Sequence, residues 1–143
     1  MIKIHSRCLL WGDNFSPRKA EALTGVLFRN KNEHGDFSAI GRYSNKPLPN
    51  GRATLDPTFN ISLQGRKSPE EWLVDILLQH IETFRACGAT DFILHFDIVW
   101  KDQCNLQFDS PFIQKIGKLN IPLTLSCEEG AMNECDLNSV ESE

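Results

Sequence analysis

The sequence predicts an α+β domain in which three helices pack on an antiparallel or mixed sheet of about five to six strands, in the order β-α-β-β-α-β-β-α-β. One observation is a Ser-Pro pair that occurs three times, each time before a stretch with helical spacing: Ser16-Pro17, Ser68-Pro69 and Ser110-Pro111. The other is the run 92–101, in which every even-numbered residue is apolar and the odd-numbered residues include both polar and apolar ones. Because strands and helices do not alternate strictly and a hairpin is expected, we predict helices on one face of the sheet.

The three helices are expected at 17–24, from 69 to a stop at Gly88, and at 111–119. A serine N-cap accepts a hydrogen bond from a backbone N–H of the first turn, and proline fits the first helical position because its missing N–H has no partner there. The second helix is the best defined, since Glu70 and Glu71 complete a capping box in its first turn.

Strands are expected in the remaining apolar stretches, at 7–11, 37–43, 58–63, 92–101, 104–108 and 121–127. Within 92–101 the even-numbered positions are all apolar, which indicates one fully apolar face. The short link 101–103 predicts an antiparallel hairpin between 92–101 and 104–108. Pro122 cannot donate to a ladder, so it lies at a strand start or on an edge.

The composition is that of an ordinary globular domain. Of the 143 residues, 41% are hydrophobic and 24% are charged, which is enough to bury a core. The start of the chain has no signal-peptide pattern, and no apolar run is long enough to span a bilayer. The five cysteines are odd in number and lack CxxC spacing, so we expect them reduced and mostly buried. Together these features predict a cytoplasmic protein without a membrane partner.

The negative charge is confined to the C-terminal end. The formal net charge is −4, and residues 128–143 hold six acidic and no basic residues. Without them, 13 acidic residues face 15 basic ones, so the rest of the chain is about +2. We therefore expect a single domain at 1–127 followed by an acidic, flexible tail at 128–143.

No catalytic motif occurs in the sequence. There is no phosphate-binding glycine loop, no nucleophile elbow and no histidine or cysteine set at zinc spacing. His95 and Asp97 share one strand face and would suit an acid–base pair in a small hydrolase. A half-exposed polar strand face is the favoured interpretation. We therefore expect no catalytic residue, no metal and no cofactor, and a non-enzymatic protein.

The middle of the chain, at 29–67, is rich in Lys and Arg with interleaved aromatic residues. Three interpretations remain open: a solvated loop region, a protein interface, and a nucleic-acid surface on which cations neutralise phosphates and aromatic rings stack on bases. The residues expected to contact a partner combine this segment with the start of the tail: Arg42, Tyr43, Lys46, Arg52, Arg66, Lys67, Glu128 and Glu129.

The run Cys8–Pro17 (CLLWGDNFSP), followed by Ala22–Gly25, resembles the opening of a bacterial domain-of-unknown-function family, numbered four-two-seven-nine. The run Leu106–Ile113 and the strand after it resemble the closing strand-helix-strand of that family. The match covers most of 8–127, and it departs at 56–59, where the family often has a tryptophan.

The resemblance implies a fold and carries no catalytic residues. Small bacterial α+β domains of this kind often look like immunity or antitoxin proteins, which bind and neutralise a toxin. A cognate toxin domain is therefore the expected partner, and the alternative is a nucleic acid bound by the basic 29–67 segment.

Overall fold

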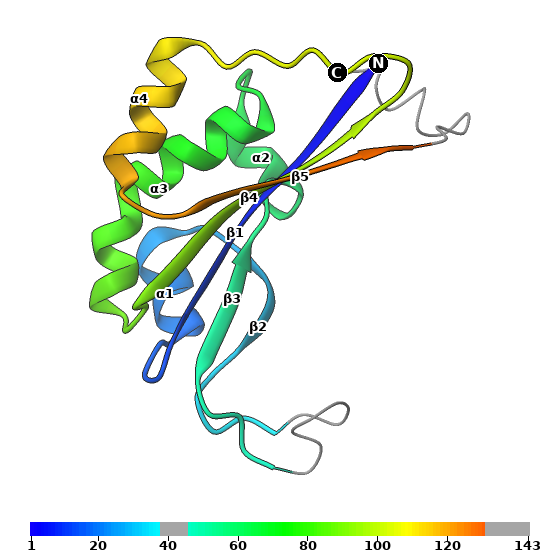
Figure 1. The fold of residues 1–143 in the computed structure, drawn as a ribbon. Coiled ribbons are helices and arrows are strands. Elements are labelled where there is room, and N and C mark those ends of the chain that lie inside the picture. The colour runs from blue at the N-terminus through cyan, green and yellow to red at the C-terminus, as the bar shows by residue number, and fades with distance from the viewer. Residues whose placement is uncertain (38–45, 131–143) are drawn as a thin grey trace.

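The computed structural model describes residues 1–37 and 46–130, and it places five strands in one mixed sheet (Figure 1). The strands are β1 (Ile2–Gly12), β2 (Phe28–Asn32), β3 (Gly51–Leu55), β4 (Asp91–Trp100) and β5 (Leu123–Glu129). The helices are α1 (Pro17–Thr24), α2 (Ile61–Gln64), α3 (Pro69–Ala86) and α4 (Ser110–Leu119), and a 3₁₀ helix, η1 (Pro57–Asn60), precedes α2. The predicted α+β class and mixed sheet are confirmed.

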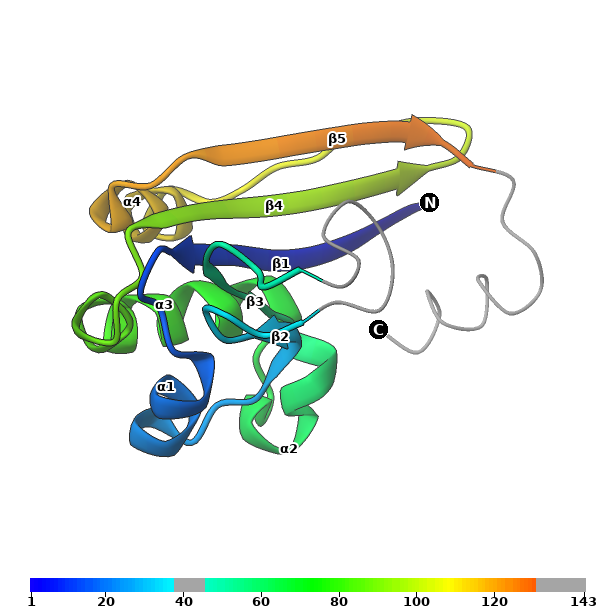
Figure 2. The ribbon, with the colours of Figure 1, turned by 90° about the horizontal axis from the view of Figure 1, so that it is seen from below.

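The sheet order is β2-β3-β1-β4-β5. β1 is antiparallel to both β3 and β4, β2 is antiparallel to β3, and β5 is parallel to β4. The segment from β1 to β4 is thus a split β-α-β unit, to which α4 and β5 add one parallel strand. Helices α1, α3 and α4 lie on one face of the sheet (Figures 1 and 2). Among the described residues, no helix covers the other face.

The predicted cap residues explain where the helices begin. Ser16 accepts a hydrogen bond from the amide of Lys19 at 3.2 Å, and Ser68 accepts one from Glu71 at 3.3 Å. In the third helix the cap is one residue earlier than predicted. The side chain of Asp109 accepts from the amide of Phe112, so α4 begins at Ser110.

The core lies between the sheet and the helices. The inward side chains of the two central strands are almost fully buried: Cys8, Leu10, Leu94, Phe96 and Ile98. Phe84 of α3 packs on Phe28 of β2 with ring centroids 5.6 Å apart. Since burial of one large apolar side chain stabilises by about 1.5–3 kcal/mol, these contacts determine which face of each strand turns inward.

The strand predicted at 58–63 is wrong. Asp56 accepts a hydrogen bond from the amide of Thr58 and Pro57 takes the first helical position, so the chain forms η1 and then α2. The longer helices α1 and α3 begin in the same way, with a capping residue followed by proline. The three predicted helices become four helices and one 3₁₀ helix.

The strand predicted at 104–108, and its hairpin with 92–101, are also wrong. β4 is paired with β1 on one edge and with β5 on the other, so it has no edge left for a third strand. The segment instead leads to α4, and Phe108 packs on Phe96 with ring centroids 5.8 Å apart. Within the described residues, the predicted strands at 58–63 and 104–108 are therefore both absent.

The remaining strands differ from the predicted ranges in extent. β2 and β3 were not predicted, because their sequences carry little alternation. Phe37 forms an isolated antiparallel bridge with Pro47, and most of the strand predicted at 37–43 lies outside the described residues. β5 runs from 123 to 129, so it includes Glu128 and Glu129, which we expected in the tail.

The cysteines fall into two groups. Cys8 and Cys87 are buried, whereas Cys104 and Cys127 are exposed and Cys135 lies outside the described residues. Burial raises the pKa of the Cys8 thiol to about 12, so this thiol stays protonated. The expectation of mostly buried cysteines thus holds for two of the four described.

No helix among the described residues combines the length and apolar character needed to cross a membrane.

Two glycines fix the position of β3 against β1. Gly12 and Gly51 are opposite each other at one end of the pair. A β-carbon at Gly51 would overlap the backbone carbonyl of Phe15, and one at Gly12 would overlap the carbonyl of Gly88. Backbone segments therefore meet here without intervening side chains, which only glycine allows.

We predict that Gly51→Ala lowers the free energy of unfolding by roughly 3 kcal/mol, because the added methyl group must displace backbone atoms. Gly117→Ala is the matched control. Gly117 lies in α4 with open space around its α-carbon, so this change should stabilise by about 0.5–1 kcal/mol. Urea unfolding of both variants measures the difference, and equal effects would contradict the close contact at Gly51.

Candidate functional site

Exposed apolar side chains occur on η1 and α2 and on the connection between α1 and β2, which Asn60 joins. Leu27, Phe59, Ile61 and Leu63 are 53%, 48%, 70% and 52% exposed. We call these four residues the Asn60 patch. Large apolar side chains left exposed together are a known mark of protein interaction sites.

Asn60 holds this region together. It is 2% exposed, and its side chain joins two segments far apart in sequence. Its Oδ1 accepts a hydrogen bond from the amide of Leu27 at 2.8 Å, and its Nδ2 donates to the Leu27 carbonyl at 2.9 Å. Nδ2 also donates to the carbonyl of Asp56 at 3.1 Å.

Asp56 gives the segment a second polar anchor. Its carboxylate accepts from the amide and hydroxyl of Thr58, and it forms an ion pair with Arg29 at 3.1 Å. η1 and α2 are thus held by buried polar bonds, while about half or more of each apolar side chain of the Asn60 patch stays exposed.

The residues predicted to contact a partner are only partly brought together. Arg66 and Lys67 directly follow α2, beside the Asn60 patch. Glu128 and Glu129 lie on β5, which β4 and β1 separate from β3. The predicted set is therefore not one continuous surface.

Two more of the predicted residues lie elsewhere, and two are outside the described part. Arg52 is on β3 opposite Trp11, on the sheet face away from the helices, and Lys46 is exposed. Arg42 and Tyr43 lie outside the described residues.

The basic 29–67 segment carries less free charge than its sequence indicates. Arg29 pairs with Asp56 within the segment, Lys31 pairs with Glu21 at 2.7 Å, and Lys67 pairs with Asp75 at 2.6 Å. Glu21 and Asp75 come from α1 and α3, so the folded chain supplies acids that a linear count of the segment leaves out.

His95 and Asp97 do lie together on the uncovered face of β4. His95 Nε2 is 2.8 Å from one carboxylate oxygen of Asp97, and Arg7 of β1 donates to the other at 2.5 Å. Partial burial opposes ionisation of Asp97, but the hydrogen bonds and charges of Arg7 and His95 outweigh it and lower the pKa of this carboxyl.

This arrangement is an ion-pair network between β1 and β4. In the part of the chain that the structure describes, no serine, threonine or cysteine side chain is hydrogen-bonded to His95. The same described residues contain no group of three or more His, Cys, Asp or Glu side chains placed to hold a metal ion.

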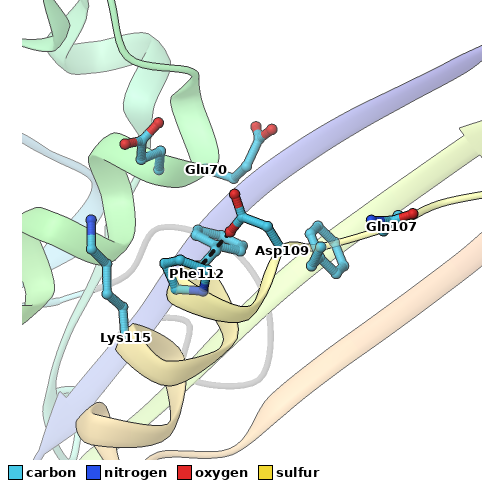
Figure 3. A pocket seen from close by; sticks show the side chains of 8 residues that line it. Glu70, Gln107, Asp109, Phe112 and Lys115 are labelled. Carbon is cyan, nitrogen blue, oxygen red and sulfur yellow. Dashed lines mark hydrogen bonds between the residues drawn. The ribbon is translucent and has the colours of Figure 1, made fainter.

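A small pocket lies between the beginnings of α3 and α4 (Figure 3). Its volume is about 240 Å³, and Glu70, Asp109, Phe112 and Lys115 line it. Two of its polar groups have structural partners, since Asp109 caps α4 and Lys115 binds Asp75 at 2.9 Å. The pocket is therefore explained by the packing of two helix starts.

Sequence reasoning missed Asn60 and the exposed patch around it. The sequence predicts a strand at 58–63, whereas Phe59, Ile61 and Leu63 lie in η1 and α2 with exposed side chains. Asp56-Pro57 was the available signal, because it has the form of a helix start.

Comparisons of the chain with protein-family models, with curated proteins and with solved structures found no match.

We predict that Asp97→Asn lowers stability at neutral pH by about 1 kcal/mol, a small value because 34% of the side chain is exposed. A carboxyl with a lowered pKa contributes its full stabilisation when the pH is above its ordinary pKa of 3.8. This contribution is lost as the pH falls through the lower pKa of the folded state. The difference between wild type and variant should therefore shrink in acid below about pH 4.

Urea unfolding at several pH values measures this difference. Asp13→Asn, at an exposed position in the turn after β1, is the control for removing a carboxylate outside this ion-pair network. A wild-type advantage that persists unchanged at the lowest pH would contradict the ionised role of Asp97.

Proposed function

We propose that the chain is a non-enzymatic protein-binding domain, and specifically an immunity or antitoxin protein that binds and neutralises a toxin domain. The Asn60 patch carries the proposal. Four large apolar side chains are exposed on two segments, η1–α2 and the α1–β2 connection, that buried polar bonds hold together, so a partner would meet a pre-formed surface.

Covering the exposed apolar side chains with a protein partner is more favourable in free energy than leaving them in water. Covering a large apolar side chain is worth about 1.5–3 kcal/mol, and rigid segments lose little conformational entropy on binding. Arg66, exposed just after α2, supplies a cation at the rim of the patch. An apolar centre with a polar rim is the usual anatomy of a protein interface.

The alternative, a nucleic-acid-associated protein, has weaker support. Three cations of the 29–67 segment are already in ion pairs, with Asp56, Glu21 and Asp75. If nucleic acid were nevertheless the partner, retention on a single-stranded DNA column should be clear at low salt and should fall steeply as salt rises.

We predict that Ile61→Glu abolishes binding to the cognate partner while the fold is retained. Ile61 is 70% exposed, so its replacement should change the free energy of unfolding by no more than about 0.5 kcal/mol. A charge placed at the centre of an apolar interface should weaken binding by a hundredfold or more. Co-expression with the proteins encoded beside its gene, followed by co-purification and toxicity assays, provides the measurement.

Ile113→Glu is the matched control. Ile113 is 55% exposed on α4, well away from η1 and α2, and its replacement should leave binding unchanged. Equal loss of binding in both variants would contradict the assignment to the Asn60 patch. If no neighbouring gene product binds or is neutralised, the immunity function is wrong.

A further inference from the structure

Half of β1 has an unpaired edge. β3 pairs with β1 only between Cys8 and Gly12, whereas β1 begins at Ile2. β4 pairs with β1 along its whole length. The other side of 2–6 therefore faces no strand among the described residues.

The direction of the backbone groups on this edge follows from the β1–β4 pairing. Met1 accepts a hydrogen bond from the amide of Lys101 at 3.0 Å and donates one to its carbonyl at 3.2 Å. Backbone groups in antiparallel strands alternate in direction, so odd-numbered residues of β1 face β4. Ile2, Ile4 and Ser6 then direct their N–H and C=O groups to the free side.

A groove runs along this free side. One cavity of about 420 Å³ lies beside Ser6 and Thr58, and another of about 540 Å³ lies beside Ile2 and Arg66. Ile4 and Pro69 line both cavities, so the two adjoin. We call this the β1 groove. One wall is the strand edge, and the other consists of η1 and the beginning of α3.

Polar atoms along the groove lack partners. Ser6 is 7% exposed, and its Oγ has no hydrogen-bond partner within the described residues. The same holds for Nε of Arg29, which also lines the groove. Both atoms have almost no solvent-accessible surface, so they lie behind the groove wall and are not contact points for a ligand.

The charges of the groove indicate the chemistry of its ligand. Five Lys or Arg residues line the two cavities, against three Asp or Glu residues. Arg7, Arg29 and Lys67 are in ion pairs. Lys3 lines one cavity and Arg66 the other, and neither has a carboxylate partner among the described residues. Glu70 has no basic partner among them either, so the unpaired charge of the groove is still positive.

We propose that the β1 groove binds an extended acidic peptide, a segment of a protein partner, by strand addition. The peptide continues the line of β3 and forms main-chain hydrogen bonds with Ile2, Ile4 and Ser6. Strand addition takes its affinity from these bonds and its specificity from alternate side chains. Apolar side chains of the peptide meet Ile4 and Pro69, and its carboxylates meet Lys3 and Arg66.

This site goes beyond the proposed function, because its strand edge and apolar contacts are separate from the Asn60 patch; Arg66, at the rim of that patch, is shared between the two. A five-residue stretch of β1, about 17 Å long, sets the size of the probe. We use the acetylated and amidated peptide Asp-Val-Glu-Val-Asp and measure its binding to the full chain by calorimetry. Its lysine analogue, with every acid replaced by lysine, should not bind.

The decisive variant is Ile4→Pro, with Ile4→Ala as its control. Proline at position 4 removes the backbone N–H that faces the groove. The hydrogen bonds from β1 to β4 are made by odd-numbered residues, so they are retained. Ile4→Pro should weaken binding at least tenfold more than Ile4→Ala. Equal affinities of the two variants, or no binding of the peptide to wild type at millimolar concentration, would overturn the proposal.

N-methylation of the peptide gives a test that does not depend on folding of a variant. In a bound strand, every second peptide amide faces β1 and the amides between them face away from it. Methylating the amides that face β1 should abolish binding, whereas methylating the others should not. Equal effects of the two sets would show attraction of charges without strand addition and would overturn the proposal. Slower hydrogen exchange at the Ser6 amide with peptide bound would support it.

Discussion

The close approach of backbone at Gly12 and Gly51 determines much of the surface of this protein. It holds the start of β3 against the end of β1, beneath the carbonyl of Phe15. From that fixed point β3 runs five residues and stops at Leu55, because Asp56 and Pro57 begin η1. β1 is more than twice as long. A contact at one end of the sheet therefore decides which backbone groups are left unpaired at the other end.

The same end of β3 explains where the apolar surface lies. η1 and α2 begin as soon as the strand stops, and Asn60 and Asp56 hold them to the α1–β2 connection and to Arg29. Polar bonds of this kind have directional requirements, so they fix a conformation without covering the neighbouring side chains. Exposed apolar residues can therefore be presented in one arrangement, which is what recognition by a partner requires.

Local signals predicted much of the fold. The caps at Ser16 and Ser68 and the alternation from Phe92 to Trp100 depend on nearby residues only, and the structure agrees with them. The strand predicted at 104–108 failed for a non-local reason, since β5 takes the edge of β4 that the hairpin needed. The candidate site was harder to predict. Free charge depends on which acids approach in space, as with Lys31 and Glu21, and a linear segment does not contain that information.

The addition of α4 and β5 to the split β-α-β unit has a consequence for local unfolding. β5 contacts only one strand, β4, and each of its seven residues is exposed. The four other strands all lie within residues 1–100, so their pairing uses no residue of α4 or β5. Opening of this last unit leaves the β1–β3 and β1–β4 pairing intact. The C-terminal unit is therefore expected to be a separate cooperative unit, with a lower free energy of opening than the sheet it extends.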